Sequence, residues 1–292
     1  MIVLTTSSFP SHPDDYRGRF VLEFANHLAE LSPHPVNVLV PDPPGITNEP
    51  TAFRTTPLSA TPFSPFGRSG LPQNIIRDPL SILGLGAALQ SLKRTLRQRY
   101  PERHLTVAHW LLPFGSLCAR EDARTSKPTW IVCHSGGVHL MAKLPPPVRQ
   151  RLLAPLDRPS AHLSFTTEDL RETFHRAAGP SASRFSTSIL PMGIDTSPFR
   201  ANEPNKSGPI ALLGRLVPIK GFDLALEAVS LFQQKTGETI AIRVIGGGVQ
   251  ERSLRALATR LELNVEWLGE CSPSAAARAL DGCSLAIIPS RT

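Results

Sequence analysis

The sequence predicts an α/β fold in which helices cover parallel β-sheets, arranged as two domains. Short apolar runs that look like buried strands alternate with amphipathic stretches along almost all of the 292 residues, and such alternation is typical of βαβ units. Residues 191–209 interrupt it with a polar stretch rich in proline and asparagine. We therefore expect one domain over 1–190 and a second over 191–292.

The first domain is expected to alternate strands and helices. Its strands are expected at 2–5, 36–40, 105–110, 129–133, 162–165 and 186–190. Helices are expected over about 19–31, over about 80–100, and from Thr166 or Thr167 to Gly179. The inward face of the first helix is expected to carry Phe20, Phe24, Leu28 and Leu31. Residues 41–79 are rich in Pro, Ser, Thr and Gly, so no regular structure is expected there.

The helix expected over 80–100 combines an apolar stripe with a cluster of cations. The stripe is Leu85, Leu89, Leu92 and Leu96, and the cations are Lys93, Arg94, Arg97 and Arg99. Such a helix can rest on an anionic membrane surface. It can equally pack its leucines in the core while the cations face the negative carboxyl end of the helix. We favour core packing and keep peripheral membrane contact as the alternative.

The most informative stretch is residues 214–221, Gly-Arg-Leu-Val-Pro-Ile-Lys-Gly. It follows the apolar run 210–213 and precedes an amphipathic helix that is expected to end before Gly237. A buried strand therefore turns sharply, presents Arg215 and Lys220, and opens a helix N-terminus. Because a helix N-terminus and two fixed cations attract a dianion, the arrangement favours a nucleotide pyrophosphate. The alternative is a surface turn with two solvated charges.

A second glycine-rich turn, Gly246-Gly247-Gly248, directly follows the strand-like run 240–245 and precedes another amphipathic helix. Three glycines permit positive φ angles and let a ligand approach the backbone closely. Two consecutive strand–turn–helix units of this kind predict a nucleotide site at the carboxyl edge of a parallel sheet. The alternative is a helix that packs tightly on a strand, which also requires glycine.

Composition narrows the function classes. The net charge of +7 suits anionic partners, but the basic residues are dispersed and not interleaved with aromatic ones, which argues against nucleic acid. The four cysteines, Cys118, Cys133, Cys271 and Cys283, lack metal-ligand spacing. No apolar run is as long as a membrane span, and the N-terminus lacks the charged region of a signal peptide. We expect a cytoplasmic protein, with peripheral contact at the inner membrane surface as the alternative.

Short motifs recur in a characteristic order along the chain. They are Ser8-Phe9-Pro10 with Gly18, His109-Trp110 with Pro113 and Gly115, His134-Ser135-Gly136, Leu190 to Asp195, Gly214-Arg215 to Lys220-Gly221, Gly246 to Gly248, and Pro289-Ser290. In this order they resemble glycosyltransferase family 4, the retaining enzymes of GT-B fold. The resemblance spans nearly the whole chain.

The resemblance implies two Rossmann-like, doubly wound parallel-sheet domains that face a cleft, the first on the acceptor side and the second binding a nucleotide sugar. It implies that a UDP-sugar or GDP-sugar gives its sugar to a hydroxyl of a carbohydrate, lipid or small-molecule acceptor. The anomeric configuration would be kept, and the product would be a polysaccharide, glycolipid or related glycoconjugate. Arg215 and Lys220 match the cations that hold the donor diphosphate in that family. Because charge builds on this leaving group, such cations would act in catalysis as well as in binding.

The resemblance also assigns further site residues. His134 matches a family histidine near the reacting sugar and counts as catalytic together with the two cations, while His109 and Trp110 would line the acceptor side, with ordinary packing as the alternative. The donor-binding set is Gly18, Gly214, Arg215, Lys220, Gly246, Gly247 and Gly248. The chain has no Asp-x-Asp element, so neither a metal nor another cofactor is expected.

There are departures from the family pattern. Relatives continue after Pro289-Ser290 with a Glu-Gly-rich loop and two glutamates that bind ribose and the donor sugar, whereas the sequence given stops at Thr292. The second domain is therefore expected to be incomplete at its C-terminus and the chain to be poorly active by itself. Gly137-Val138 also stands where family members often carry an acidic residue.

Two other function classes stay open. An NAD-dependent oxidoreductase would use Gly246-x-Gly248 with Glu266 as the ribose ligand, but position 251 is Glu where the fingerprint requires Gly. A truncated or degenerate transferase would instead be a non-catalytic nucleotide-binding module.

Overall fold

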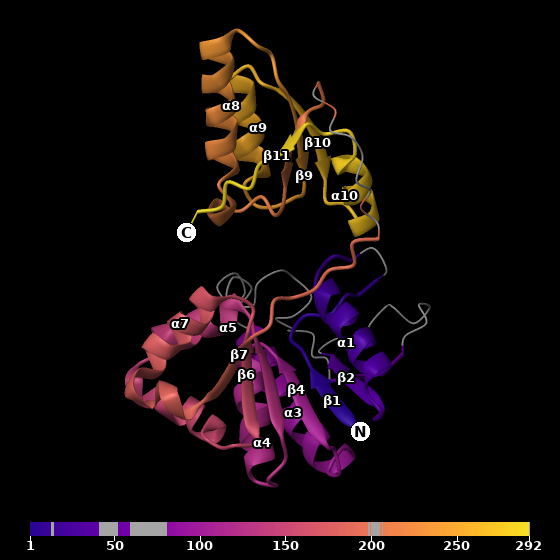
Figure 1. The fold of residues 1–292 in the computed structure, drawn as a ribbon, viewed down its shortest axis with the longest axis vertical. Helices are drawn as coiled ribbons and strands as arrows, with labels where there is room; N and C mark the ends of the chain where they lie inside the picture. The colour runs from indigo at the N-terminus through magenta and orange to yellow at the C-terminus, as the bar shows by residue number, and fades with distance from the viewer. Residues whose placement is uncertain are drawn as a thin grey trace. The chain divides into compact units, whose positions relative to one another are not determined.

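The computed structural model describes residues 1–12, 15–40, 52–58, 81–197, 199, 205 and 207–291. The chain forms two compact units, Met1–Ile194 and Asp195–Thr292, shown in Figure 1. The boundary expected from the sequence, between 190 and 191, lies close to this division.

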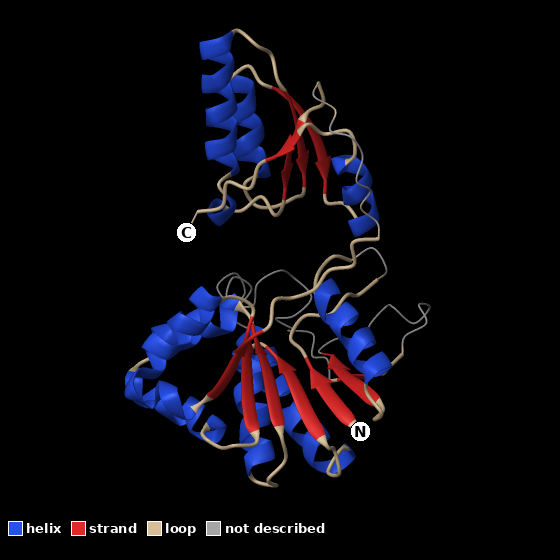
Figure 2. Ribbon diagram, in the orientation of Figure 1, coloured by secondary structure: helices blue, strands red, loops and turns tan. Residues whose placement is uncertain are grey.

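The first unit is built on a seven-stranded sheet in which every pairing is parallel (Figure 2). The strand order is β3-β2-β1-β4-β5-β6-β7. The strands are β1 (Ile2–Thr5), β2 (Val36–Val40), β3 (Arg54–Pro57), β4 (Leu105–His109), β5 (Thr129–Cys133), β6 (Ala161–Phe165) and β7 (Ser186–Ile189). The chain runs outward in one direction from β1 and then in the other from β4, which is the doubly wound order expected from the sequence.

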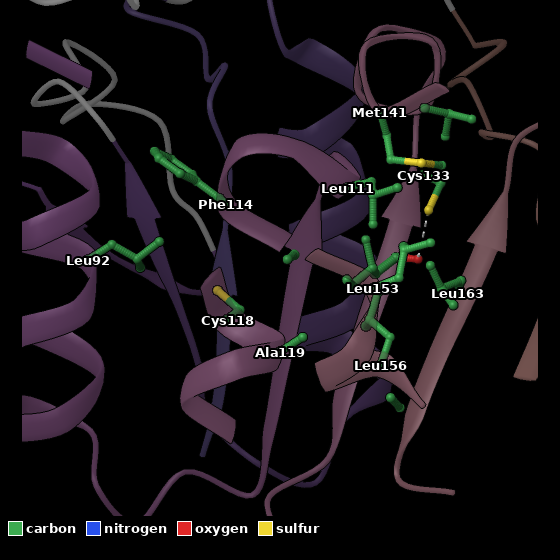
Figure 3. Close-up of a cluster of buried hydrophobic side chains, with 14 of the residues drawn as sticks. Leu92, Leu111, Phe114, Cys118, Ala119, Cys133, Met141, Leu153, Leu156 and Leu163 are labelled. Atoms are coloured by element: carbon green, nitrogen blue, oxygen red, sulfur yellow. Dashed lines mark hydrogen bonds between the residues drawn. The ribbon is translucent and has the colours of Figure 1, made fainter. Parts of the chain in front are cut away.

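Helices cover both faces of this sheet. They are α1 (Arg19–Leu31), α3 (Ser81–Arg94) continued by η1 (Thr95–Arg99), η2 (Leu111–Gly115), α4 (Ser116–Ala123), α5 (Ser135–Lys143), α6 (Pro146–Leu153) and α7 (Glu168–Ala178). One face packs on α1, and the other packs on residues of α3, α4, α5 and α7. Figure 3 shows the second core, with Leu92 of α3, Phe114 of η2 and Cys118 of α4. Strands buried on both faces need the near-continuous apolar runs that identified them in the sequence.

The helix α1 has the predicted bounds, but its buried stripe is rotated from the predicted one. Val21, Leu22 and Ala25 are its fully buried residues, and the predicted Phe20, Phe24 and Leu28 are partly buried beside them. Leu31 was wrongly predicted to face inward, since it is 85% exposed. It is the last residue of the helix, where the chain turns away toward β2.

The interpretation of residues 80–100 as a core-packed helix is confirmed. Leu92 and Leu96 are fully buried, and Leu85 and Leu89 pack against the same core. One of the cations, Arg97, forms a bidentate ion pair with Glu121 of α4. Contact of this helix with a membrane surface stays a prediction.

The segment 41–79 contains a strand that the sequence analysis missed. Within this segment the structure describes residues 52–58, and β3 lies there, parallel to β2. Its flanking residues Phe53 and Leu58 are buried. Because the strand itself reads Arg-Thr-Thr-Pro, it carries no apolar run that would have revealed it.

A buried ionic network holds the amino edge of the sheet. Arg103 donates to Asp122 through Nε and Nη2, and Asp122 also accepts from the hydroxyls of Thr106 on β4 and Thr129 on β5. Arg103 further donates to two backbone carbonyls. Both members of the pair are almost completely buried, so the network ties α4 and the segment before β4 to the strands they precede.

The second unit repeats the plan on a smaller scale. Its parallel sheet has the order β10-β9-β8-β11. The elements are β8 (Ile210–Leu213), α8 (Phe222–Thr236), β9 (Ala241–Ile245), α9 (Glu251–Arg260), β10 (Asn264–Gly269), α10 (Pro273–Leu280) and β11 (Leu285–Ala286). The helices α8 and α9 pack on one face of the sheet, and α10 lies on the other (Figure 1). As predicted, α8 ends before Gly237.

Each sheet reverses its winding at one point, between β1 and β4 in the first unit and between β8 and β11 in the second. Doubly wound sheets bind ligands just beyond the carboxyl ends of the strands at such a reversal. The predicted site residues follow β1, β4 and β5 in the first unit and β8 and β9 in the second. Across the part of the chain that the structure describes, no helix is both long enough and apolar enough to cross a bilayer.

Candidate functional site

The predicted donor turn begins where β8 ends, at the winding reversal of the second sheet. Gly214 donates its backbone N–H to the carbonyl of Ile245, and a short 3-10 turn, Pro218–Lys220, leads through Gly221 into α8. Arg215 and Lys220 are both half-buried on this turn. Neither side chain makes a hydrogen bond or ion pair with any residue that the structure describes. Half-buried cations without an acidic partner beside a helix N-terminus are the arrangement that typically binds anions, and anion binding at this turn stays a prediction.

The glycine turn after β9 is joined to the donor turn by backbone contacts. Leu216 donates to the carbonyl of Gly247 at 2.8 Å, and Gln250 donates to the carbonyl of Leu216 at 3.0 Å. A Cβ atom at Gly246 would collide with the carbonyl of Gly214, and one at Gly248 would collide with Leu216. These glycines therefore have a structural cause, the close approach of two turns. Direct contact of the glycines with a ligand stays a prediction.

A segment from the end of the sequence braces the same turn. Arg291 donates from Nη1 to the carbonyl of Pro218 at 2.6 Å and forms a bidentate ion pair with Asp223 in the first turn of α8. Its backbone N–H donates to the carbonyl of Ile219 at 2.8 Å. Arg291 thus forms hydrogen bonds with Pro218 and Ile219, two of the three residues of the 3-10 turn that ends at Lys220. The ion pair lowers the pKa of Asp223 and keeps it ionised.

In the first unit the structure brings together two predicted residues, His109 and His134. His109 is the last residue of β4, and His134 follows the neighbouring β5 as the N-cap of α5. Their Nδ1 and Nε2 atoms, respectively, lie 3.0 Å apart. The ring planes are only 15° apart and the ring centroids are 5.2 Å apart. With the two nitrogens so close, the rings lie edge to edge and share one hydrogen bond.

Aromatic side chains enclose this histidine pair. Phe20 of α1 lies 5.0 Å from the His134 ring, and Phe24 meets the His109 ring edge-on at 4.9 Å. Trp110 packs on His134 at 4.8 Å between centroids. The backbone of Trp110 has a φ of 70°, which turns the chain sharply after β4. Trp110 is partly exposed, whereas His109 is 0% exposed. A ligand outside the enclosure could therefore contact His134 but not His109.

Both imidazoles are kept neutral by this environment. Burial lowers the pKa of His134 to about 4. Burial, and then the neighbouring His134, lower the pKa of His109 well below its ordinary value. A neutral histidine carries one N–H donor and one bare acceptor nitrogen. At neutral pH the pair can therefore donate or accept hydrogen bonds, but it supplies no fixed positive charge.

The loop between β1 and α1 carries an ionic cluster that the sequence analysis did not single out. Asp15 is buried and accepts hydrogen bonds from Ser11 and from the backbone and guanidinium of Arg17. Burial opposes ionisation of Asp15, but these bonds prevail and hold its pKa far below the ordinary value. Gly18 follows with a φ of 68°, and a Cβ there would lie 2.6 Å from the carbonyl oxygen of Ser8. The adjacent Asp14 lies outside the described residues.

The structure also bears on the oxidoreductase alternative. Glu266 lies inside β10 and not beyond its carboxyl end, and its carboxylate accepts a hydrogen bond from Arg243 at 2.7 Å. An acid that is to bind ribose should be free at the strand end. The arrangement therefore disfavours a dinucleotide site built on Glu266. Within the described residues no group of three or more His, Cys, Asp or Glu side chains is placed to hold a metal ion, and metal independence stays a prediction.

Comparison with known proteins gives a family match in the second unit. Residues 194–292 match the family model described as glycosyl transferases group 1. A GDP-mannose-dependent alpha-(1-6)-phosphatidylinositol monomannoside mannosyltransferase of Mycolicibacterium smegmatis is 30% identical over 126 residues, which cover 39% of this chain. The match spans 32% of that relative's own length.

Solved structures share the fold of the whole chain at low sequence identity. The glycosyltransferase WaaG, involved in lipopolysaccharide biosynthesis, has a TM-score of 0.60 and 16% identity over 100% of this chain and 75% of its own. An E. coli trehalose-6-phosphate protein bound with UDP-2-fluoro glucose has a TM-score of 0.68 and 14% identity, covering 99% of this chain and 78% of its own.

The two parallel-sheet units and these likenesses define the fold of the chain as the GT-B fold. Over residues 194–292 the chain also matches the glycosyl transferases group 1. The predicted fold class and the predicted resemblance to GT-B transferases are thereby confirmed.

Proposed function

We propose that the chain transfers a sugar from a nucleoside-diphosphate sugar to an acceptor hydroxyl, with retention of the anomeric configuration, as a member of glycosyltransferase family 4. The observation that carries the proposal is the pair of half-buried cations, Arg215 and Lys220, without an acidic partner among the described residues at the winding reversal of the second sheet. One relative is a GDP-mannose-dependent mannosyltransferase, and one structural neighbour was solved with a UDP-sugar. Either nucleotide supplies the diphosphate that this turn fits.

The chemistry follows from the charges on the turn. When the bond between the sugar and the diphosphate breaks, negative charge accumulates on the leaving phosphate. Arg215 and Lys220 stabilise this charge more in the transition state than in the ground state, which lowers the barrier. Arginine grips two phosphate oxygens at once, and lysine acts as a point charge. The leaving phosphate then accepts the proton of the incoming hydroxyl on the same face of the sugar, so no base-activated nucleophile is needed.

Calorimetric titration with UDP, GDP, ADP and NAD tests the donor site. Arg215→Ala and Lys220→Ala should each weaken binding of the preferred diphosphate by about 1.5–3 kcal/mol, as expected for a lost hydrogen bond to a charged group. Arg260→Ala is the matched control, because Arg260 is an exposed cation at the far end of α9. Addition of EDTA should leave the affinity unchanged.

Three results would argue against the proposal in different ways. Equal affinity in all variants would remove the two cations from the donor site. A preference for NAD would favour the oxidoreductase. Tight diphosphate binding without sugar transfer to any acceptor in a panel of carbohydrates, lipids and small alcohols would favour a non-catalytic nucleotide-binding module. Retention itself is read from the anomeric proton coupling of the product by NMR.

A further inference from the structure

We propose that His109 is a positioning residue that fixes the tautomer of His134, so that His134 presents an Nδ1–H donor to the ligand. The inference rests on the proposed function in one respect, because it takes the surroundings of His134 as the sugar-binding part of the first unit. The tautomer itself is a property of the ligand-free protein and can be measured without any substrate.

The geometry leaves only two arrangements of the shared proton. The 3.0 Å contact joins Nδ1 of His109 to Nε2 of His134, and two neutral imidazoles that share one hydrogen bond use one N–H and one lone pair. In the first arrangement His109 donates from Nδ1, and its own Nε2 is a bare lone pair. In the second, His134 donates from Nε2, and Nε2 of His109 must carry a proton.

The surroundings of His109 distinguish these arrangements. Nε2 of His109 is buried and has no hydrogen-bond partner among the described residues. In proteins a buried backbone N–H without a partner is rarer than a buried carbonyl that is not fully satisfied, and we apply the same order of preference to this imidazole nitrogen. The ring of Phe24, at 4.9 Å, offers at most a weak N–H···π contact. The first arrangement, with the proton on Nδ1 of His109, is therefore the more stable one.

The consequence falls on His134. Because its Nε2 accepts from His109, its proton is on Nδ1. That atom makes no hydrogen bond with a described residue, and it is not among the buried atoms that lack a partner, so it retains contact with solvent. An Nδ1–H at this place donates to an oxygen of a ligand, such as a sugar hydroxyl. It has no lone pair with which to take a proton, so His134 binds and orients in this state and does not act as a base from Nδ1.

The neutral state of the pair supports this arrangement. Burial lowers the pKa of both imidazoles, so no second proton competes for the shared position at neutral pH. The side chains whose rings pack against the pair are Phe20, Phe24 and Trp110, and none of them carries a charge.

Nitrogen-15 NMR of the ligand-free protein, labelled at histidine, tests the assignment directly. Two-bond proton–nitrogen correlations distinguish the two tautomers of each ring. We expect both His109 and His134 to carry the proton on Nδ1 at pH 7.5. A proton on Nε2 of His134 in the folded wild-type protein would overturn the proposal, and this measurement needs no variant.

Variants then test whether His109 is the cause. His109→Phe keeps a ring in the aromatic enclosure but removes the donor, so His134 should revert toward the Nε2–H tautomer that free histidine prefers. Phe24→Leu is the control, because Phe24 packs on His109 without a polar group, and it should leave the Nδ1–H signal in place. Retention of the Nδ1–H tautomer in His109→Phe would overturn the positioning role. His109→Asn, whose amide can donate from nearly the same place, should restore it in part.

Activity gives a readout that is separate from folding and from the donor turn. If transfer is observed, His109→Phe should lower kcat/KM roughly tenfold, the value of about one hydrogen bond, while the affinity for the free nucleoside diphosphate stays as in the wild type. An unchanged kcat/KM would overturn the role of His134 as an oriented donor. If the wild-type protein does not bind a nucleoside diphosphate, that result contradicts the proposed function. The tautomer assignment is unaffected, because it is measured without a ligand.

Discussion

The αL turn at Gly18 allows a quantitative test of how closely the loop after β1 approaches α1. In Gly18→Ala the new Cβ would lie 2.6, 2.7 and 2.8 Å from three backbone atoms of Ser8 and Phe9. Real Cβ atoms essentially never come within 3.0 Å, so the loop must move by at least about 0.4 Å, the difference between 3.0 and 2.6 Å. Backbone atoms cannot rotate away as a side chain can. Overpacking of this kind costs about 1–3 kcal/mol, in addition to about 1–2 kcal/mol for an alanine in the left-handed region.

Gly237→Ala separates the two contributions. Gly237 has nearly the same backbone angles, φ 75° and ψ 1° against φ 68° and ψ 11° at Gly18. Beyond its chain neighbours, no atom of the described residues would lie within 4 Å of an added Cβ. Gly237→Ala should therefore lose only about 1–2 kcal/mol of stability, which is the cost of an alanine in the left-handed region. Hydrogen–deuterium exchange measures each loss in its own unit, from the amides of α1 for Gly18→Ala and of α8 for Gly237→Ala. Equal losses in the two variants would refute the close-approach argument.

Two further predictions concern buried titratable groups. His134 has a folded-state pKa of about 4 against 6.5, so its contribution to stability is complete above pH 6.5 and is lost as the pH falls toward 4. At about 1.4 kcal/mol for each unit of pKa, the complete loss is about 3.5 kcal/mol, and most of it has occurred by pH 4. Urea titrations of the wild type and His134→Gln at several pH values measure it, and parallel curves would contradict it. Asp122→Ala leaves Arg103 buried without its partner and should lose about 3–5 kcal/mol of unfolding free energy. Glu102→Ala removes the exposed partner of Lys127 and should lose less than about 1 kcal/mol in the same assay. Similar losses in the two variants would show that pairing with Asp122 does not stabilise the buried Arg103.

Strands and helices with strong local signals could be predicted to the residue. The bounds of β1, α1 and β2 agree with the structure, because buried parallel strands carry continuous apolar runs and Gly18 and Ser32 end the periodic pattern between them. Short helices were missed, among them α10. A local signal for it did exist, since Ser272 caps the helix by accepting from the N–H of Ala275 and Pro273 follows at its first position.

The candidate site could be predicted in part. Arg215 and Lys220 were found because the turn that carries them is continuous in the sequence. The contact between His109 and His134 could have been predicted, since they lie at the carboxyl ends of neighbouring parallel strands, but the pairing of β4 with β5 had to be known first. The ion pair of Arg291 with Asp223 joins residues 68 positions apart, and no local pattern reports such a contact. Tertiary packing alone decides it.

The brace from Arg291 has a consequence for the thermodynamics of ligand capture. A flexible turn that must become ordered around a ligand subtracts its lost conformational entropy from the affinity. In this protein the turn becomes ordered when the chain folds, because Arg291 then contacts Asp223 and the carbonyls of Pro218 and Ile219. The entropy cost of ordering the turn is therefore part of folding and not of ligand binding. Lys220, at the end of the braced turn, is then presented in advance. For the diphosphate binding proposed above, the consequence is that little of the binding free energy is lost to ordering the backbone of this turn.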